Sequence, residues 1–65
     1  MQVELNGRTI ETDASTLAEL MAEQQIDMRS VATALNGTFV PRSGYASQRL
    51  ETGSQVEILS PMQGG

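Results

Sequence analysis

The chain of 65 residues carries eight acidic residues against four arginines, and it has no lysine, histidine or cysteine, so its formal net charge is -4. This length fits one small domain. Histidine, cysteine and lysine usually supply the general base, the thiol nucleophile, the Schiff-base amine and the soft metal ligands of active sites. Because the chain lacks all three, neither independent catalysis nor a metal site is expected. The negative charge has the wrong sign for binding nucleic acid, and without an export leader or an apolar run of about 18 residues the sequence predicts a cytoplasmic protein that does not bind a membrane.

Residues 1–12, MQVELNGRTIET, predict a β-hairpin. Apolar and polar residues alternate along the first strand, which is the pattern of a strand with one buried face. The pair Asn6-Gly7 supplies the two positive φ angles that a type I′ turn requires. The apolar positions are Met1, Val3, Leu5 and, on the return strand, Ile10.

One amphipathic helix is expected over residues 17–25. Thr16 and Glu19 match a capping box, in which the Thr16 hydroxyl accepts from the Glu19 N–H and the Glu19 carboxylate accepts from the Thr16 N–H. Apolar residues spaced three and four apart then form one stripe, which is expected to pack into the core rather than bind a cofactor. These residues are Leu17, Leu20 and Met21.

A second hairpin signal lies in residues 31–42, VATALNGTFVPR. Two short β-rich runs flank Asn36-Gly37, which we interpret as turn chemistry and nothing more. Pro41 has no N–H to donate to a neighbouring strand, so it is expected to end the strand or to lie on an edge.

The segment 43–54 has no clean period and is expected to be irregular. Within it, Tyr45 and Leu50 are candidates to hold the chain against the core. The run QVEIL that follows predicts a final strand, with Val56 and Ile58 on one face, and Pro61 stops that strand.

This order of elements predicts an α+β fold. Packing one main helix across one face of a mixed sheet of four or five strands is the economical way to bury these apolar sets. The order suits a ubiquitin-like β-grasp, in which the first and last strands are parallel neighbours in the middle of the sheet. We therefore divide the chain into a β-grasp domain, residues 1–60, and a flexible, reactive C-terminal tail, residues 61–65.

A sheet with one helix leaves its other face uncovered, and a partner surface is expected there. Leu59 is out of phase with the two buried positions of the last strand, so it is a candidate for this open face, and Arg42 is a second candidate contact. The sequence leaves open which pair in the third strand points away from the helix: Ala32 and Ala34, or Val31 and Leu35.

The stretch SPMQGG ends on two glycines, which are poor residues for an ordered end because Gly has the most conformational entropy to lose. A terminal carboxylate becomes reactive once ATP has converted it to an acyl-adenylate. Residues without a Cβ can carry that carboxylate through a narrow channel into the active site of another protein. We therefore expect the Gly65 carboxylate to be adenylated and then attacked by a sulfur or amine nucleophile, and Gly64, Gln63 and Met62 to thread into partner active sites.

Several segments occur here in a familiar order: VELNG near the start, TLAEL at the helix, LNG…VPR over residues 35–42, G-x-x-V-E-I over residues 53–58, and the Gly-Gly end. Through them the chain resembles, from its first residue to its last, the sulfur carriers of thiamine biosynthesis, which are small β-grasp proteins of thiazole assembly. Two positions depart from the family pattern, and neither touches the chemistry: Tyr45 stands where many members have Trp, and Phe39 is bulkier than the usual aliphatic residue.

The resemblance implies a protein cosubstrate and not an enzyme. In this family the terminal glycine, which corresponds to Gly65 here, is adenylated by an ATP-dependent adenylyltransferase related to the activating enzymes of ubiquitin-like systems. Sulfur from cysteine, delivered by a desulfurase-type enzyme, then gives a thiocarboxylate that thiazole synthase consumes. The carrier binds no cofactor itself, because the ATP belongs to the activating enzyme.

Three other functions stay open on the sequence alone. The small subunit of molybdopterin synthase does the same terminal chemistry, although such chains are typically longer. A ubiquitin-like modifier would join Gly65 to lysines of other proteins. A β-grasp interaction module would carry its Gly-Gly end by accident.

Overall fold

The computed structural model describes residues 1–60. The expected helix and all of the expected strands are present, and two short 3₁₀ helices, η1 and η2, lie in the connections. In chain order the elements are β1 (Gln2–Leu5), β2 (Arg8–Glu11), α1 (Leu17–Glu23), η1 (Met28–Ser30), β3 (Ala32–Leu35), β4 (Thr38–Val40), η2 (Arg42–Gly44) and β5 (Gln55–Leu59).

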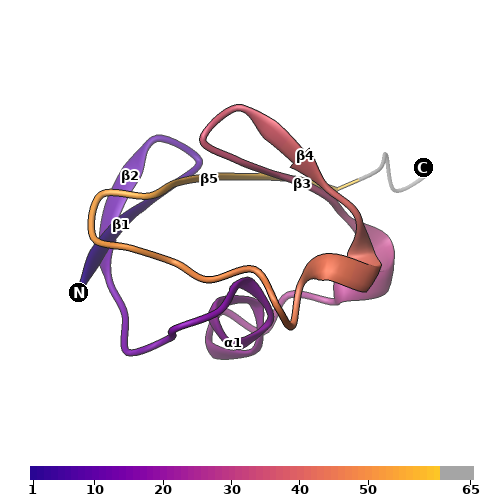
Figure 1. The fold of residues 1–65 in the computed structure, drawn as a ribbon, viewed down its shortest axis with the longest axis horizontal. Coiled ribbons are helices and arrows are strands. Elements are labelled where there is room, and N and C mark those ends of the chain that lie inside the picture. Colours follow the sequence, from indigo (N-terminus) through magenta and orange to yellow (C-terminus); the bar gives the residue numbers. More distant parts are fainter. Residues whose placement is uncertain (61–65) are drawn as a thin grey trace.

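The strands form one mixed sheet in the order β2-β1-β5-β3-β4. Strands β1 and β5 are parallel neighbours, and every other pair is antiparallel. Helix α1 lies against one face of this sheet, and no helix of the described chain covers the other face (Figure 1). The α+β β-grasp architecture expected from the sequence is therefore confirmed.

The core lies between the helix and the sheet. The apolar stripe of α1 has no exposed surface, as its spacing predicts. Tyr45 and Leu50 are also buried, so the irregular segment is held against the core at the two expected positions. The remaining buried apolar side chains are Val3, Ala14, Leu35, Val40, Val56 and Ile58.

Both Asn-Gly pairs form the predicted turns. The φ angles are 52° at Asn6 and 83° at Gly7, and 52° at Asn36 and 84° at Gly37, as a type I′ turn requires. The interpretation of Asn36-Gly37 as turn chemistry alone is wrong, however, because the Asn36 Oδ1 accepts a 2.8 Å hydrogen bond from the N–H of Gln55 on β5. A side chain of the turn thus extends the pairing of the sheet.

The start of α1 follows the predicted capping box with one shift. The Glu19 N–H donates to the Thr16 Oγ1 at 3.2 Å, as expected. The Glu19 carboxylate makes its closest contacts one residue earlier, accepting from the N–H of Ser15 at 2.7 Å and from its hydroxyl at 3.0 Å. The hydrogen bond from the Ser15 backbone is the main reason that the pKa of Glu19 lies below its usual value.

The end of α1 comes two residues before the predicted one, at Glu23, and Gln25 explains why. Its φ is 58°, which lies outside the helical region. The N–H of Gln25 donates to the Ala22 carbonyl, and the N–H of Ile26 donates to the Met21 carbonyl, which together make a Schellman motif. Such a motif usually places glycine where this chain has glutamine.

Gln25→Gly is accordingly expected to raise the free energy of unfolding by about 0.5–1 kcal/mol, because glycine adopts a positive φ without a Cβ clash. Guanidinium-induced unfolding measures the change. The matched control is Gln24→Gly, since Gln24 has a φ of -88° and gains no such relief. A Gln25→Gly protein that is less stable than the natural one would contradict this explanation of the helix end.

Thr33 on β3 is only 2% exposed, and its hydroxyl has no hydrogen-bond partner within the described part of the chain. Thr33→Val removes a buried hydroxyl at nearly constant shape, so the free energy of unfolding is expected to rise by about 1 kcal/mol. Thr12→Val is the control that should lower it, because the equally buried Thr12 hydroxyl donates to Glu23 and accepts from the Ala14 N–H. Urea unfolding measures the free energy of unfolding of both variants. A loss of stability in Thr33→Val would contradict the conclusion that the Thr33 hydroxyl is buried without a hydrogen bond.

Candidate functional site

Strand β5 leads directly into the segment expected to react. It is a central strand, paired with β3 from Val56 to Leu59 and with β1 at Gln55 and Val56. Its inward side chains are buried, and its described end is Ser60. The predictions for Met62, Gln63, Gly64 and Gly65 lie outside the described residues, so the structure bears on the body that presents them.

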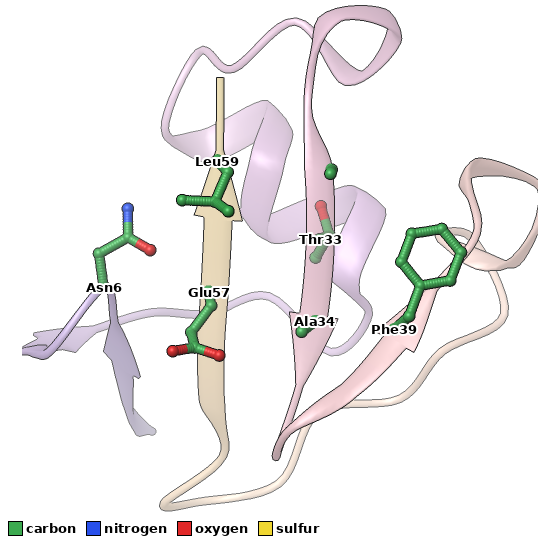
Figure 2. A pocket seen from close by; sticks show the side chains of 7 residues that line it. Asn6, Thr33, Ala34, Phe39, Glu57 and Leu59 are labelled. Atoms are coloured by element: carbon green, nitrogen blue, oxygen red, sulfur yellow. The ribbon is translucent and has the colours of Figure 1, made fainter. Parts of the chain in front are cut away.

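The uncovered face of the sheet holds an apolar groove near the end of β5. Ala32 and Ala34 point away from the helix, whereas Leu35 is buried, which settles the alternative that the sequence leaves open. Leu59 lies on this open face, as expected, with 70% of its surface exposed. The groove has a volume of about 470 Å³. Leu59, Ala32 and Ala34 line it together with Phe39 on β4 (Figure 2).

Phe39 is a site residue that the sequence interpretation missed. The sequence marks it only as bulkier than the usual aliphatic residue of the family, but 66% of its surface is exposed. Its backbone pairs with Ala34, so the two side chains share the open face. The register of the Asn36-Gly37 turn could have predicted the position of Phe39. The turn pairs Leu35 with Thr38, so Phe39, the next residue of β4, lies opposite Ala34. We call Leu59, Phe39, Ala32 and Ala34 the apolar patch.

Acidic side chains flank the apolar patch on the same face. Glu57 lies on β5 two residues before Leu59 and lines the groove (Figure 2). Glu4 on β1 lines a neighbouring hollow together with Glu57. The open face is therefore apolar towards the end of β5 and acidic towards β1.

Two arginines lie at the end of the sheet where the chain leaves β5. Strands β4 and β5 both run antiparallel to β3, so Arg42, in η2 directly after β4, lies at that end. Arg29 lines a hollow there together with Leu59 and Ser60, and the sequence analysis did not single it out. Its guanidinium pairs with Asp27 at 3.2 Å, and this contact is the main cause of an Asp27 pKa below the usual value.

Residues 1–60 contain no group of three or more His, Cys, Asp or Glu side chains that could hold a metal ion. No helix in this range is long and apolar enough to cross a membrane. What the described chain does offer is the end of a central strand beside an apolar patch, an arrangement that can dock on a partner and present the residues that follow.

Residues 2–65 match the model of the ThiS family. The chain belongs to the ThiS family. The resemblance found in the sequence is thereby confirmed, and with it the assignment to the ubiquitin-like sulfur carriers of thiamine biosynthesis.

Solved structures agree with this ThiS membership. The crystal structure of the thiamine biosynthesis protein ThiS from Geobacter metallireducens is 26% identical, superposes with a TM-score of 0.85, and is matched over 100% of both chains. An NMR solution structure of a thiamine biosynthesis protein from the same organism is 26% identical with a TM-score of 0.82, over 100% of this chain and 88% of that one.

A curated relative carries a ThiS-like segment inside a longer protein. Thiazole synthase from Paramagnetospirillum magneticum is 35% identical over 66 residues, which cover all of this chain. The match covers 20% of that protein, so this chain spans about a fifth of its length.

Proposed function

We propose that this ThiS-family chain works as a protein cosubstrate whose Gly65 carboxylate carries the sulfur. A ubiquitin-activating-like adenylyltransferase joins that carboxylate to AMP from ATP and releases pyrophosphate. A cysteine desulfurase-type enzyme supplies a persulfide whose outer sulfur displaces AMP, and a cellular thiol then reduces the acyl disulfide, which releases the desulfurase thiol and leaves a thiocarboxylate. Thiazole synthase transfers this sulfur to its substrate, and an oxygen atom from that substrate or from water restores the carboxylate. The chain performs none of these steps as a catalyst, needs no bound cofactor, and acts in the cytoplasm, where ATP is available.

The position of β5 supports this proposal most directly. A central strand that is anchored in the core ends beside the apolar patch, and six residues, Ser60 to Gly65, remain beyond it. Fully extended, they span about 20 Å. A partner that docks on the sheet therefore receives the carboxylate at a limited distance from the docking site, with Gly64, Gln63 and Met62 entering its active site.

The open face provides the docking surface in this proposal. The apolar patch exposes two large side chains, Leu59 and Phe39, in one groove, which is the kind of surface that marks a protein interaction site. Glu57 and Glu4 beside it favour a partner with basic residues around an apolar centre. Arg42 lies at the end where the chain leaves the sheet, and we assign it a contact at the rim of that interface.

The thiazole synthase relative supports the last step of the proposal, the transfer of sulfur to thiazole synthase. In that protein a ThiS-like segment belongs to the same polypeptide as the rest of the protein, and the whole is named for thiazole synthesis. This relative therefore supports thiazole synthase as the enzyme that receives the sulfur.

The test of the proposal is sulfur loading by purified partners. The chain is incubated with its activating enzyme, ATP and a cysteine desulfurase with cysteine, and then treated at neutral pH with a thiol-selective alkylating reagent. Because the chain has no cysteine, only a thiocarboxylate should be labelled. The proposal is supported if labelling requires ATP and is lost when thiazole synthase and its substrates act on the loaded chain before alkylation. Lysine-linked adducts on other proteins, without labelling at Gly65, would indicate a modifier instead.

A further inference from the structure

The side chain of Asn6 continues the pairing of β5 beyond the point where β1 ends. The backbone pairing between the two strands stops at Leu5 and Val56, with one more hydrogen bond of 2.9 Å from the Asn6 N–H to the Val56 carbonyl. The chain then turns away through Gly7. At Ile58, the next residue whose backbone faces this edge, the Asn6 Oδ1 accepts from the N–H at 2.8 Å, and the Asn6 Nδ2 donates to the carbonyl at 3.2 Å.

The amide of Asn6 therefore takes the place of one more strand residue. A carboxamide offers one donor and one acceptor side by side, as a peptide unit does, and here both engage the same residue of β5 (Figure 2 shows Asn6 beside that strand). Only Leu59, paired with Ala32 on the other side, follows Ile58 within the sheet. Asn6 is thus the last contact on the β1 side before the segment that leads to Gly65.

Asn36 occupies the equivalent place in the other hairpin but acts at the opposite end of β5. It shares the Leu-Asn-Gly sequence and the φ of 52°. Its Oδ1 accepts from the N–H of Gln55, the first residue of β5, and not from the end that leads to Gly65. The two asparagines therefore form a natural matched pair for experiment.

We propose that Asn6 is a positioning residue for sulfur transfer, which fixes the end of β5 from which the reactive carboxylate is presented. This inference rests on the proposed function. Without the amide, the backbone of β5 beyond Val56 is paired, within residues 1–60, with β3 alone. The end of the strand can then twist away from β1 while the Ile58 side chain stays in the core. A strand end that samples more than one direction holds the carboxylate in its productive alignment for a smaller fraction of the time. This slows a reaction that depends on alignment.

The test compares Asn6→Gly with Asn36→Gly in the chain of 65 residues. Glycine tolerates the positive φ of both turns, so each variant loses a side chain without strain in the backbone. Asn6→Gly is expected to speed amide exchange at Ile58 about tenfold, with exchange at Leu20 in α1 unchanged. It should lower kcat for thiocarboxylate formation about fivefold with little change in the KM for the carrier. Asn36→Gly should leave both kinetic constants unchanged.

A second variant, Asn6→Asp, removes only one of the two hydrogen bonds that the Asn6 amide makes with Ile58. Asn6→Asp keeps an acceptor for the Ile58 N–H and loses the donor to its carbonyl, so its kcat should fall in the same direction by a smaller factor. An Asn6→Gly chain that is loaded at the natural rate, or an equal loss of kcat in Asn36→Gly, would overturn the inference and leave the proposed function standing. A natural chain that accepts no sulfur at all would instead overturn the proposed function.

Discussion

Deleting Gly65 is expected to abolish thiocarboxylate formation while leaving the folded body unchanged. The deletion moves the terminal carboxylate back by one residue, or about 3.3–3.6 Å. A group that must be aligned with ATP for attack does not tolerate such a displacement, and losses of 100-fold or more, on the order of those seen for misplaced groups, are expected. Alkylation followed by intact mass measurement, with activating enzyme, ATP and a sulfur source present, gives the readout.

Two controls accompany the deletion. The natural chain without ATP should remain unlabelled, which shows that labelling depends on activation. Guanidinium unfolding of the deleted chain should match that of the natural chain, because every buried apolar side chain among residues 1–60 lies at or before Ile58. Sulfur loading that survives the deletion would disprove the assignment of the reacting carboxylate to Gly65.

The second large effect is expected from Leu59→Asp. Burying a leucine side chain at an interface contributes about 1.5–3 kcal/mol, and a carboxylate in its place also brings the cost of desolvating a charge. The KM for the carrier should therefore rise at least about tenfold in the reaction of the activating enzyme. Because Leu59 is mostly exposed, the free energy of unfolding should change little. Steady-state kinetics at varied carrier concentration measures the effect.

The matched control is Gln2→Asp. Gln2 is exposed on β1 and does not line the groove, so this variant adds the same charge away from the apolar patch. Its KM should stay within about twofold of the natural value, since a single exposed charge contributes little. If Leu59→Asp and Gln2→Asp raise KM equally, net charge and not the apolar patch governs docking.

The elements of the fold could be predicted because their signals are local. Asn-Gly pairs set both hairpin turns, and alternation of apolar residues identified β1 and β5. The central, parallel placement of β5 followed from the order of elements rather than from any one residue. The end of α1 was predicted to within two residues. Its exact place at Glu23 depends on Gln25, which adopts a conformation that favours glycine and that no sequence rule marks for glutamine.

The candidate site could be predicted only in part. Leu59 was found from its phase in the last strand, but Phe39 and Arg29 join the site through strand pairing and through the connection before β3, which are relations between distant segments. The same holds for Asn6 and Asn36. The Asn-Gly pairs predict their role in the turns. Their hydrogen bonds to β5, however, join Asn6 to a residue 52 positions away and Asn36 to a residue 19 positions away.

Whether Gly65 carries sulfur in the cell is tested most directly on protein isolated from its host. Rapid alkylation before digestion, then cleavage by trypsin after Arg49, gives a C-terminal peptide of residues 50–65 for mass spectrometry. Alkylation is needed because exchange of oxygen for sulfur and oxidation of Met62 each add roughly 16 Da. The expected result is one alkyl group on the terminal thiocarboxylate, absent in cells without the activating enzyme. A C-terminal peptide that is never alkylated, or that is found joined to lysines of other proteins, would contradict the role of this chain as a sulfur carrier.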